Sequence, residues 1–234
     1  MLNDNFKYLV EKKFGAPQDS KALDAEQLAY AEAHLPGSYV EFLKLYGLGH
    51  YFNRGVQFVD PRQFRSLLAL IFKADTDFDH TDCHVVHFTA FGKLQVWSQR
   101  HWLVDIDLLQ YQIFCRALFP TQFDNAPTEP TRKVDADFIA SGLLPSDEDD
   151  KELWDFDQDE MFERCVQEHG ALVDGECYGF VPSLGLVGYE SRNRSVEHVK
   201  RQRALEHFAL IAQLRHFRLT RMGKSGYEYL REIG

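Results

Sequence analysis

The densest group of potential metal ligands in this sequence lies between positions 75 and 87. Carboxylates, imidazoles and thiols are the donors that a zinc or manganese ion uses in hydrolytic enzymes. The segment contains Asp75, Asp77, Asp79, His80, Asp82, Cys83, His84 and His87. However, His84 and His87 are three residues apart in a segment with the pattern of a β-strand, where odd separations place side chains on opposite faces. Unless this strand is bulged, the spacing favours a structural or surface role. A metal-dependent hydrolase that uses Asp79, His80, His84 and His87 is the alternative.

A second acidic pattern, Asp155-x-Asp157-x-Asp159, begins like a calcium-binding loop. Such loops need a glycine at the sixth position and a bidentate glutamate at the twelfth. Glu160 and Val166 occupy these positions here. The acids are better explained as the start of a helix, where an aspartate can cap the first turn and the helix dipole favours negative charge.

Other catalytic patterns are missing from the sequence. Its serines and cysteines lack the context of a nucleophile such as G-x-S-x-G. The glycine-rich segment 179–188 lacks both the lysine of a phosphate-binding loop and the dinucleotide pattern. We expect its glycines to permit tight bends and close backbone packing instead. The sequence therefore predicts a binding protein that is not an enzyme, with no metal and no cofactor.

Length and composition indicate a globular protein of one large or two small domains. The chain has 234 residues, of which 44% are hydrophobic, enough to form a substantial core. The first residues lack the pattern of a secretory signal, and no apolar stretch approaches the roughly 20 residues of a membrane-spanning helix. The four cysteines are widely spaced and are expected to be reduced. We therefore predict a cytoplasmic protein that does not bind membranes.

The net charge of −10 is concentrated in one segment. Residues 147–160 contain nine acids and one lysine, whereas residues 192–234 contain ten Lys or Arg and four acids. An acidic protein repels the phosphate backbone, so direct binding to nucleic acid is not expected. The acidic run is either a solvated linker, partly neutralised by the basic C-terminal region, or a surface that attracts a basic partner.

Hydrophobic periodicity predicts helices first and strands afterwards. Helices are expected at 3–13, 22–34, 38–47 with Ser38 as its cap, 61–73, 134–140, 159–169 and 195–214. Four runs of β-type residues recur about every ten positions, as in a meander: 85–89, 94–98, 102–106 and 111–115. Residues 120–131 contain three prolines and have no clear period, and residues 145–150 have the composition of an exposed linker. The predicted fold class is α+β, with N-terminal helices and an antiparallel meander sheet followed by a smaller α+β module.

Several segments resemble a known bacterial family. Those in the C-terminal half are 159–164, 169–172, 178–182 and 204–214. They resemble the C-terminal module of an immunity-protein family in which that module follows a GAD-like domain. The pairs Leu35-Pro36 and Val96-Trp97, together with residues 90–94, resemble the GAD-like half, where a Phe-Gly turn joins two strands. The chain departs from the motif at Val187-Gly188, where a Gly-Gly pair is expected, although Gly185 and Gly188 still permit the bend.

The resemblance implies an immunity protein that neutralises a cognate antibacterial toxin by occluding it. Members of this family are similar to the immunity partners of type VI secretion DNase toxins. The implied organisation is a GAD-like domain at 1–145, an acidic linker at 146–156 and an immunity module at 157–234. A general protein-interaction module without a toxin partner is a further alternative.

The resemblance also favours an interface over a solvated linker for the acidic run. Aromatic residues surrounded by charge are common anchors of protein interfaces. The predicted toxin-binding residues are Asp149, Asp150, Glu152, Trp154, Asp155 and Asp157.

Overall fold

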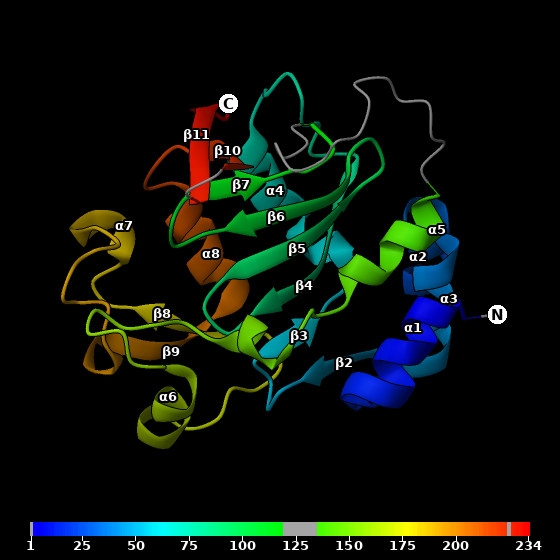
Figure 1. Ribbon diagram of the computed structural model, residues 1–234, viewed down its shortest axis with the longest axis horizontal. Helices are drawn as coiled ribbons and strands as arrows, with labels where there is room; N and C mark the ends of the chain where they lie inside the picture. Colours follow the sequence, from blue (N-terminus) through cyan, green and yellow to red (C-terminus); the bar gives the residue numbers. More distant parts are fainter. Residues whose placement is uncertain (1, 119–134, 224–225) are drawn as a thin grey trace.

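A mixed β-sheet runs through the computed structural model, which describes residues 2–118, 135–223 and 226–234 (Figure 1). Within these residues the sheet has nine strands in the order β1-β2-β3-β4-β5-β6-β7-β10-β11. All neighbours are antiparallel except β7 and β10, which are parallel. The strands are β1 (Gln18–Lys21), β2 (Leu48–Tyr51), β3 (Val56–Phe58), β4 (Cys83–Thr89), β5 (Lys93–Ser98), β6 (Trp102–Asp107), β7 (Gln112–Phe114), β10 (Arg218–Gly223) and β11 (Gly226–Glu232).

The predicted meander is confirmed as β4 to β7. Each of these strands overlaps one of the four runs with β-type residues, and consecutive strands pair with each other. Gly92 lies in the first hairpin turn with φ +86°, a conformation that glycine adopts without steric cost. The fold class is α+β, as predicted.

One face of the sheet is covered by the N-terminal helices and by a short helix from the middle of the chain. These are α1 (Asp4–Tyr8), which continues as a π-helical turn at Leu9–Phe14, α2 (Ala25–His34), α3 (Gly37–Tyr46) and α5 (Ala136–Ile139). Their apolar side chains form a core with sheet residues, in which the ring centroids of Phe42 and Phe58 lie 5.8 Å apart. The helices predicted at 3–13, 22–34 and 134–140 are thus confirmed.

The predicted cap at Ser38 is wrong. Helix α3 begins at Gly37, and its N-cap is Pro36, two residues before the predicted cap. The Ser38 N–H instead donates to Asp137 Oδ1 at 2.7 Å, and the Ser38 hydroxyl donates to the Asp137 carbonyl. A carboxylate from a distant segment therefore satisfies the helix terminus and ties α5 to α3.

The opposite face of the sheet packs against α4 (Arg65–Phe72), which follows a 3-10 turn at Pro61–Phe64, and against α8 (Ala204–Ala212). Phe88 of β4 contacts a ring on each side, with centroids 5.9 Å from Phe64 and 5.4 Å from Phe208. Both helices lie behind the strands in the view of Figure 1. This arrangement places residues from the two ends of the chain in one hydrophobic core.

A smaller unit follows the meander. It contains α6 (Phe162–His169), α7 (Leu184–Val187) and a hairpin-like pair of strands, β8 (Glu176–Phe180) and β9 (Val199–Arg203). The predicted helix at 159–169 is confirmed, but the helix predicted at 195–214 is wrong in its first half. Residues 199–203 pair with β8 along their whole length, and the helix begins only at Ala204. Tertiary pairing here overrides a local helical pattern.

The chain then returns to the large sheet. Strand β10 pairs with β7, and β11 forms the edge beyond it. Periodicity did not identify these two strands. The proline-containing segment 120–131 lies outside the described residues. No helix in the described parts of the chain is long and apolar enough to cross a membrane.

Candidate functional site

The acidic segment, defined as residues 147–160, is a folded part of the molecule. It begins with a 3-10 turn at Glu148–Lys151, where Asp147 and Asp150 form a reciprocal capping box. The Asp150 carboxylate also accepts from the Ser146 hydroxyl at 3.0 Å and is half-buried. The expected exposed linker at 145–150 is therefore a capped turn whose backbone groups are satisfied.

Glu152 starts helix α6. Its side chain is buried, and Oε1 accepts from the backbone N–H groups of Met161 and Phe162, both at 2.7 Å. A negative charge at the first turn of a helix satisfies unpaired donors and complements the helix dipole. This carboxylate is engaged inside the protein and is not available at its surface.

Asp155 closes the loop before α6. It is 4% exposed, and its Oδ1 accepts from the backbone N–H groups of Asp157 and Asp159, both at 2.9 Å. Arg164 of α6 donates to Oδ2 at 2.6 Å. Burial opposes ionisation, but these hydrogen bonds hold the pKa of Asp155 below its ordinary value. The aspartates that begin like a calcium loop thus form a turn closed by an arginine.

The remaining predicted residues point toward solvent. Asp149 and Asp157 are exposed, and Trp154 has 50% of its surface accessible. The backbone of Trp154 forms an isolated bridge with Glu160, so the indole extends from a fixed backbone. Three of the six predicted toxin-binding residues therefore lie on one short surface segment, while Glu152 and Asp155 hold that segment in place.

Two arginines of the basic C-terminal region contact this segment. Arg194 is buried and donates to the Asp155 carbonyl at 3.3 Å, and the Arg192 guanidinium lies 5.4 Å from the centre of the Phe156 ring. These contacts neutralise little of the surface charge because they engage a carbonyl and an aromatic ring. The exposed carboxylates of Asp149 and Asp157 therefore give the surface of this segment a negative electrostatic potential.

The candidate metal ligands at 75–87 are separated by the fold. Asp75 and Asp77 both accept from Arg231 of β11, which is 2.9 Å from Asp75 Oδ1. Burial opposes ionisation of Asp75, yet these hydrogen bonds lower its pKa to about 2. Asp79 accepts from Thr81 within its own turn. These carboxylates are therefore used in an ion pair and in a local turn.

The histidines of the same segment lie in β4, which has an irregular register with β5 between Val85 and His87. The strand is thus bulged. Only in a bulged strand could His84 and His87, three residues apart, point to the same side. His84 lies 3.0 Å from the Tyr30 hydroxyl, and burial lowers the pKa of His84 to about 4 and that of His87 to about 3. Among the described residues, no group of three or more His, Cys, Asp or Glu side chains could hold a metal ion.

The glycine-rich segment joins the smaller unit to the large sheet. A Cβ at Gly185 would lie 2.0 Å from the Tyr111 hydroxyl, so only glycine allows this approach. Tyr111 in turn contacts the Phe217 ring at 5.3 Å and donates to the Ile211 carbonyl at 3.3 Å. The predicted role of these glycines in close packing is confirmed at this position.

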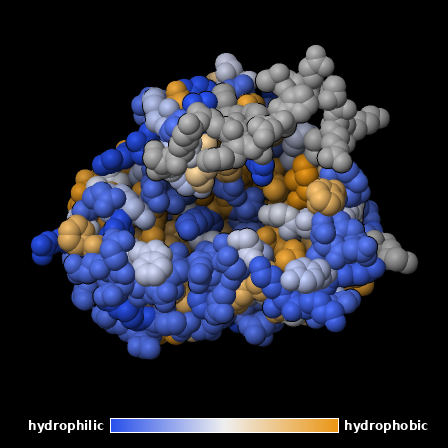
Figure 2. All heavy atoms as spheres, viewed as in Figure 1, coloured by the Kyte–Doolittle hydropathy of each residue, from blue (hydrophilic) through white to orange (hydrophobic). Residues whose placement is uncertain are grey.

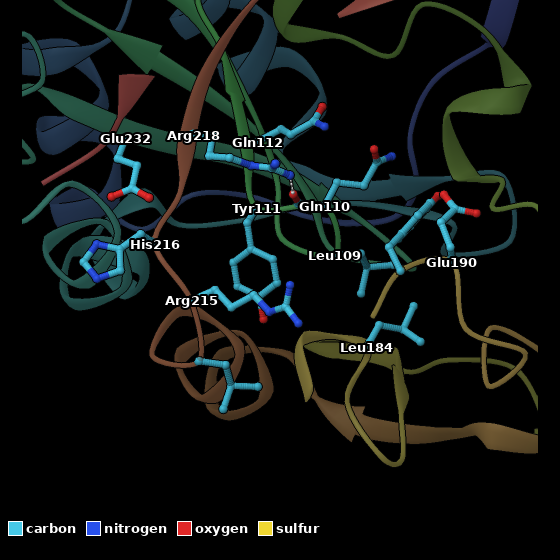
Figure 3. Close-up of a pocket in the computed structure, with 12 residues that line it drawn as sticks. Leu109, Gln110, Tyr111, Gln112, Leu184, Glu190, Arg215, His216, Arg218 and Glu232 are labelled. Carbon is cyan, nitrogen blue, oxygen red and sulfur yellow. Dashed lines mark hydrogen bonds between the residues drawn. The ribbon is translucent and has the colours of Figure 1, made fainter. Parts of the chain in front are cut away.

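A cavity of about 680 Å³ lies beside this joint (Figure 3). Leu109 and Tyr111 form one side, and Leu184 of α7 faces them from the smaller unit. Two arginines at its rim are engaged with backbone: Arg215 donates to the Gly185 carbonyl at 2.6 Å, and Arg218 donates to the Gln110 carbonyl at 3.2 Å. The Arg215 contact links α7 to the segment after α8, whereas the Arg218 contact lies within the large sheet. None of the described residues that line the cavity is a serine, threonine or cysteine.

Comparison with known proteins identifies two families along the chain. Residues 4–110 match the model of the GAD-like domain, and residues 140–215 match the model described as T6SS immunity protein Tdi1, C-terminal. The fold is similar to the crystal structure of Atu4351 from Agrobacterium tumefaciens, with a TM-score of 0.79 and 25% sequence identity over 99% of this chain and 97% of the other. No curated protein matches the chain.

Proposed function

Because this chain belongs to the GAD-like immunity protein family, we propose that it neutralises a type VI secretion toxin by binding it. The proposed toxin is a DNase, and the proposed mechanism is occlusion of the toxin by one copy of this protein. A DNase must carry a basic surface to hold the phosphate backbone. An acidic surface on its inhibitor can occupy that region and compete with DNA. Such a complex would act in the cytoplasm, where a DNase meets the chromosome.

The acidic segment is the observation that carries this proposal. It presents Asp149 and Asp157 to solvent beside the half-exposed ring of Trp154. Complementary charge raises the rate of association and selects the partner, and an aromatic anchor supplies much of the binding energy. Glu152 and Asp155 would contribute by fixing the backbone from which the exposed residues project, which lowers the entropy lost on binding.

The proposed organisation is a GAD-like domain at 1–145, an acidic linker at 146–156 and an immunity module at 157–234. The two domains would both contact the toxin, and the matched residues 4–110 and 140–215 support the presence of both parts. Protection against a potent nuclease requires nanomolar or tighter affinity, which corresponds to about −12 kcal/mol. An interface of standard size, about 1,600 Å² in total, supports such an affinity.

The experiment that tests this proposal is co-purification of the tagged protein from its native bacterium, followed by mass spectrometry. We expect recovery of one secreted, basic polypeptide at near one-to-one ratio. A matched pair of variants locates the interface. Charge reversal at Asp149 and Asp157 is expected to release the polypeptide, whereas charge reversal at Glu26, an exposed acid of α2, is expected to retain it. Recovery of no toxin-like polypeptide under conditions where the fold is intact would refute the proposal.

A further inference from the structure

The face of the large sheet that carries the N-terminal helices is only partly covered by them. Along β5, β6, β7 and β10 the side chains of this face are mostly polar, while the alternate positions, such as Val96, Val104 and Ile113, lie in the core on the other side. Figure 1 shows this face turned toward the viewer, and Figure 2 shows it hollowed in the middle. The hollow has a volume of about 510 Å³.

Strand register brings the polar side chains into two rows. His87, Gln95 and Asp105 lie opposite one another across β4, β5 and β6, and Thr220 of β10 lies beyond Phe114 in the same row. The second row contains Lys93, Asp107 and Gln112. All seven residues line the hollow. Polar side chains therefore recur at every second position of several neighbouring strands. This is the pattern of a sheet face that is in contact with solvent and not covered by helices.

His87 provides an observation that is independent of charge. Its side chain is 5% exposed and lines the hollow, and neither ring nitrogen has a hydrogen-bond partner within the described residues. Buried polar groups are nearly always paired, so an unpaired imidazole at a cavity wall indicates a missing partner. Burial keeps this ring neutral by lowering its pKa to about 3, so one nitrogen remains an acceptor at neutral pH.

The charge of the hollow is negative. Asp105, Asp107 and Asp150 line it, and Lys93 is the one basic side chain among the described lining residues. Asp107 is partly satisfied because it accepts from the Gln110 N–H at 2.9 Å. Burial between the walls of the hollow raises the pKa of Asp105 to about 6, although a hydrogen bond from Gln95 opposes this shift, and the nearby Asp150 charge adds to it. A cation placed beside Asp105 would stabilise its ionised form.

We propose that this hollow binds a guanidinium group. Guanidinium carries five N–H donors in a plane, which match carboxylate oxygens, amide oxygens and a neutral imidazole nitrogen. The volume suits a single side chain or a small molecule. The hollow is continuous with the acidic segment, because Asp150 forms part of its wall. The guanidinium group could therefore belong to an arginine of the toxin, and this alternative rests on the proposed function. The other source is a free small molecule that carries a guanidinium group.

The direct test is titration of the full-length protein with N-acetyl-arginine amide, using N-acetyl-citrulline amide as the neutral probe of the same shape. Calorimetry and NMR of the histidine side chains are the readouts. We expect saturable one-to-one binding of the arginine probe and a shift of the His87 resonances. Asp105→Asn should weaken this binding about tenfold, whereas Glu26→Gln, an exposed acid of α2 outside the hollow, should leave it unchanged. Absence of saturable binding, or equal binding by Asp105→Asn, would overturn the proposal.

The toxin recovered by co-purification distinguishes the two sources. If Asp105→Asn also weakens toxin affinity about tenfold, the guanidinium belongs to the toxin. If toxin affinity is unchanged while the arginine probe still binds to the wild type, the hollow is a site for a small molecule. The probe titration needs no toxin, so a failure of the proposed function leaves this test intact.

Discussion

Replacement of Glu152 by alanine should destabilise the protein without changing its exposed surface. The carboxylate accepts from the N–H groups of Met161 and Phe162 at the start of α6. Met161 retains a second acceptor, because its N–H also donates to the Leu153 carbonyl at 2.9 Å. Phe162 is fully buried, and its N–H loses the acceptor that Glu152 provides.

The magnitude follows from these contacts. A buried donor without a partner costs about 1–3 kcal/mol. Loss of a negative charge from the first turn of a helix costs about 0.3–1 kcal/mol more. We therefore expect Glu152→Ala to lower the free energy of unfolding by about 1–4 kcal/mol. Glu152→Gln keeps an acceptor oxygen in place and should cost less than half as much.

Urea unfolding followed by tryptophan fluorescence and far-UV circular dichroism measures the difference. Asp149→Ala is the matched control, because it removes an exposed carboxylate of the same segment and should change stability by no more than about 0.5 kcal/mol. If Glu152→Ala and Asp149→Ala have equal stability, the buried carboxylate does not start α6 and the assignment of its role is wrong.

Two further predictions concern other parts of the fold. Gly185→Ala should lower the free energy of unfolding by about 1–3 kcal/mol, because the added Cβ would clash with the Tyr111 hydroxyl. Tyr111→Phe should recover part of this loss in the double variant, as measured by urea unfolding. If the effects of the two substitutions are fully additive, the contact does not exist. Leu186→Ala, at an exposed position in the same turn, serves as the control. The raised pKa of Asp105 means that the folded state binds a proton more tightly than the unfolded state, so stability falls as pH rises from about 4 to about 6. Asp105→Asn should therefore be more stable than the wild type above pH 6 and equal to it near pH 4, and thermal unfolding at the two pH values decides this.

Local pattern was sufficient to predict the meander and most helices. Strands β4 to β7 alternate apolar and polar residues and are joined by short turns, so their pairing follows from neighbouring sequence. Strands β10 and β11 could not be found in this way. Strand β10 pairs in parallel with β7, about a hundred residues earlier, and β11 exposes Tyr227 and Tyr229 at the sheet edge, which weakens the alternation.

The candidate site was predictable in composition but not in detail. The sequence shows an acidic segment with aromatic residues, and that segment is present as a folded surface element. It does not show that Glu152 turns inward, because the N–H groups of Met161 and Phe162 become its neighbours only when α6 forms. For the same reason it does not show that Arg164 of α6 reaches Asp155. The unpaired His87 was visible only as a candidate metal ligand. Its position at the hollow depends on the register of four strands, which no local pattern encodes.

The central claim is that the exposed acidic segment binds a secreted toxin. Calorimetric titration of this protein into the toxin recovered from the native bacterium, with wild type and an Asp149→Lys/Asp157→Lys variant in parallel, tests it most directly. We expect one-to-one binding with nanomolar affinity for the wild type and at least a hundredfold loss for the folded variant, equal to about 2.7 kcal/mol. Equal affinity of the two proteins would contradict the account, because the acidic segment would then lie outside the interface.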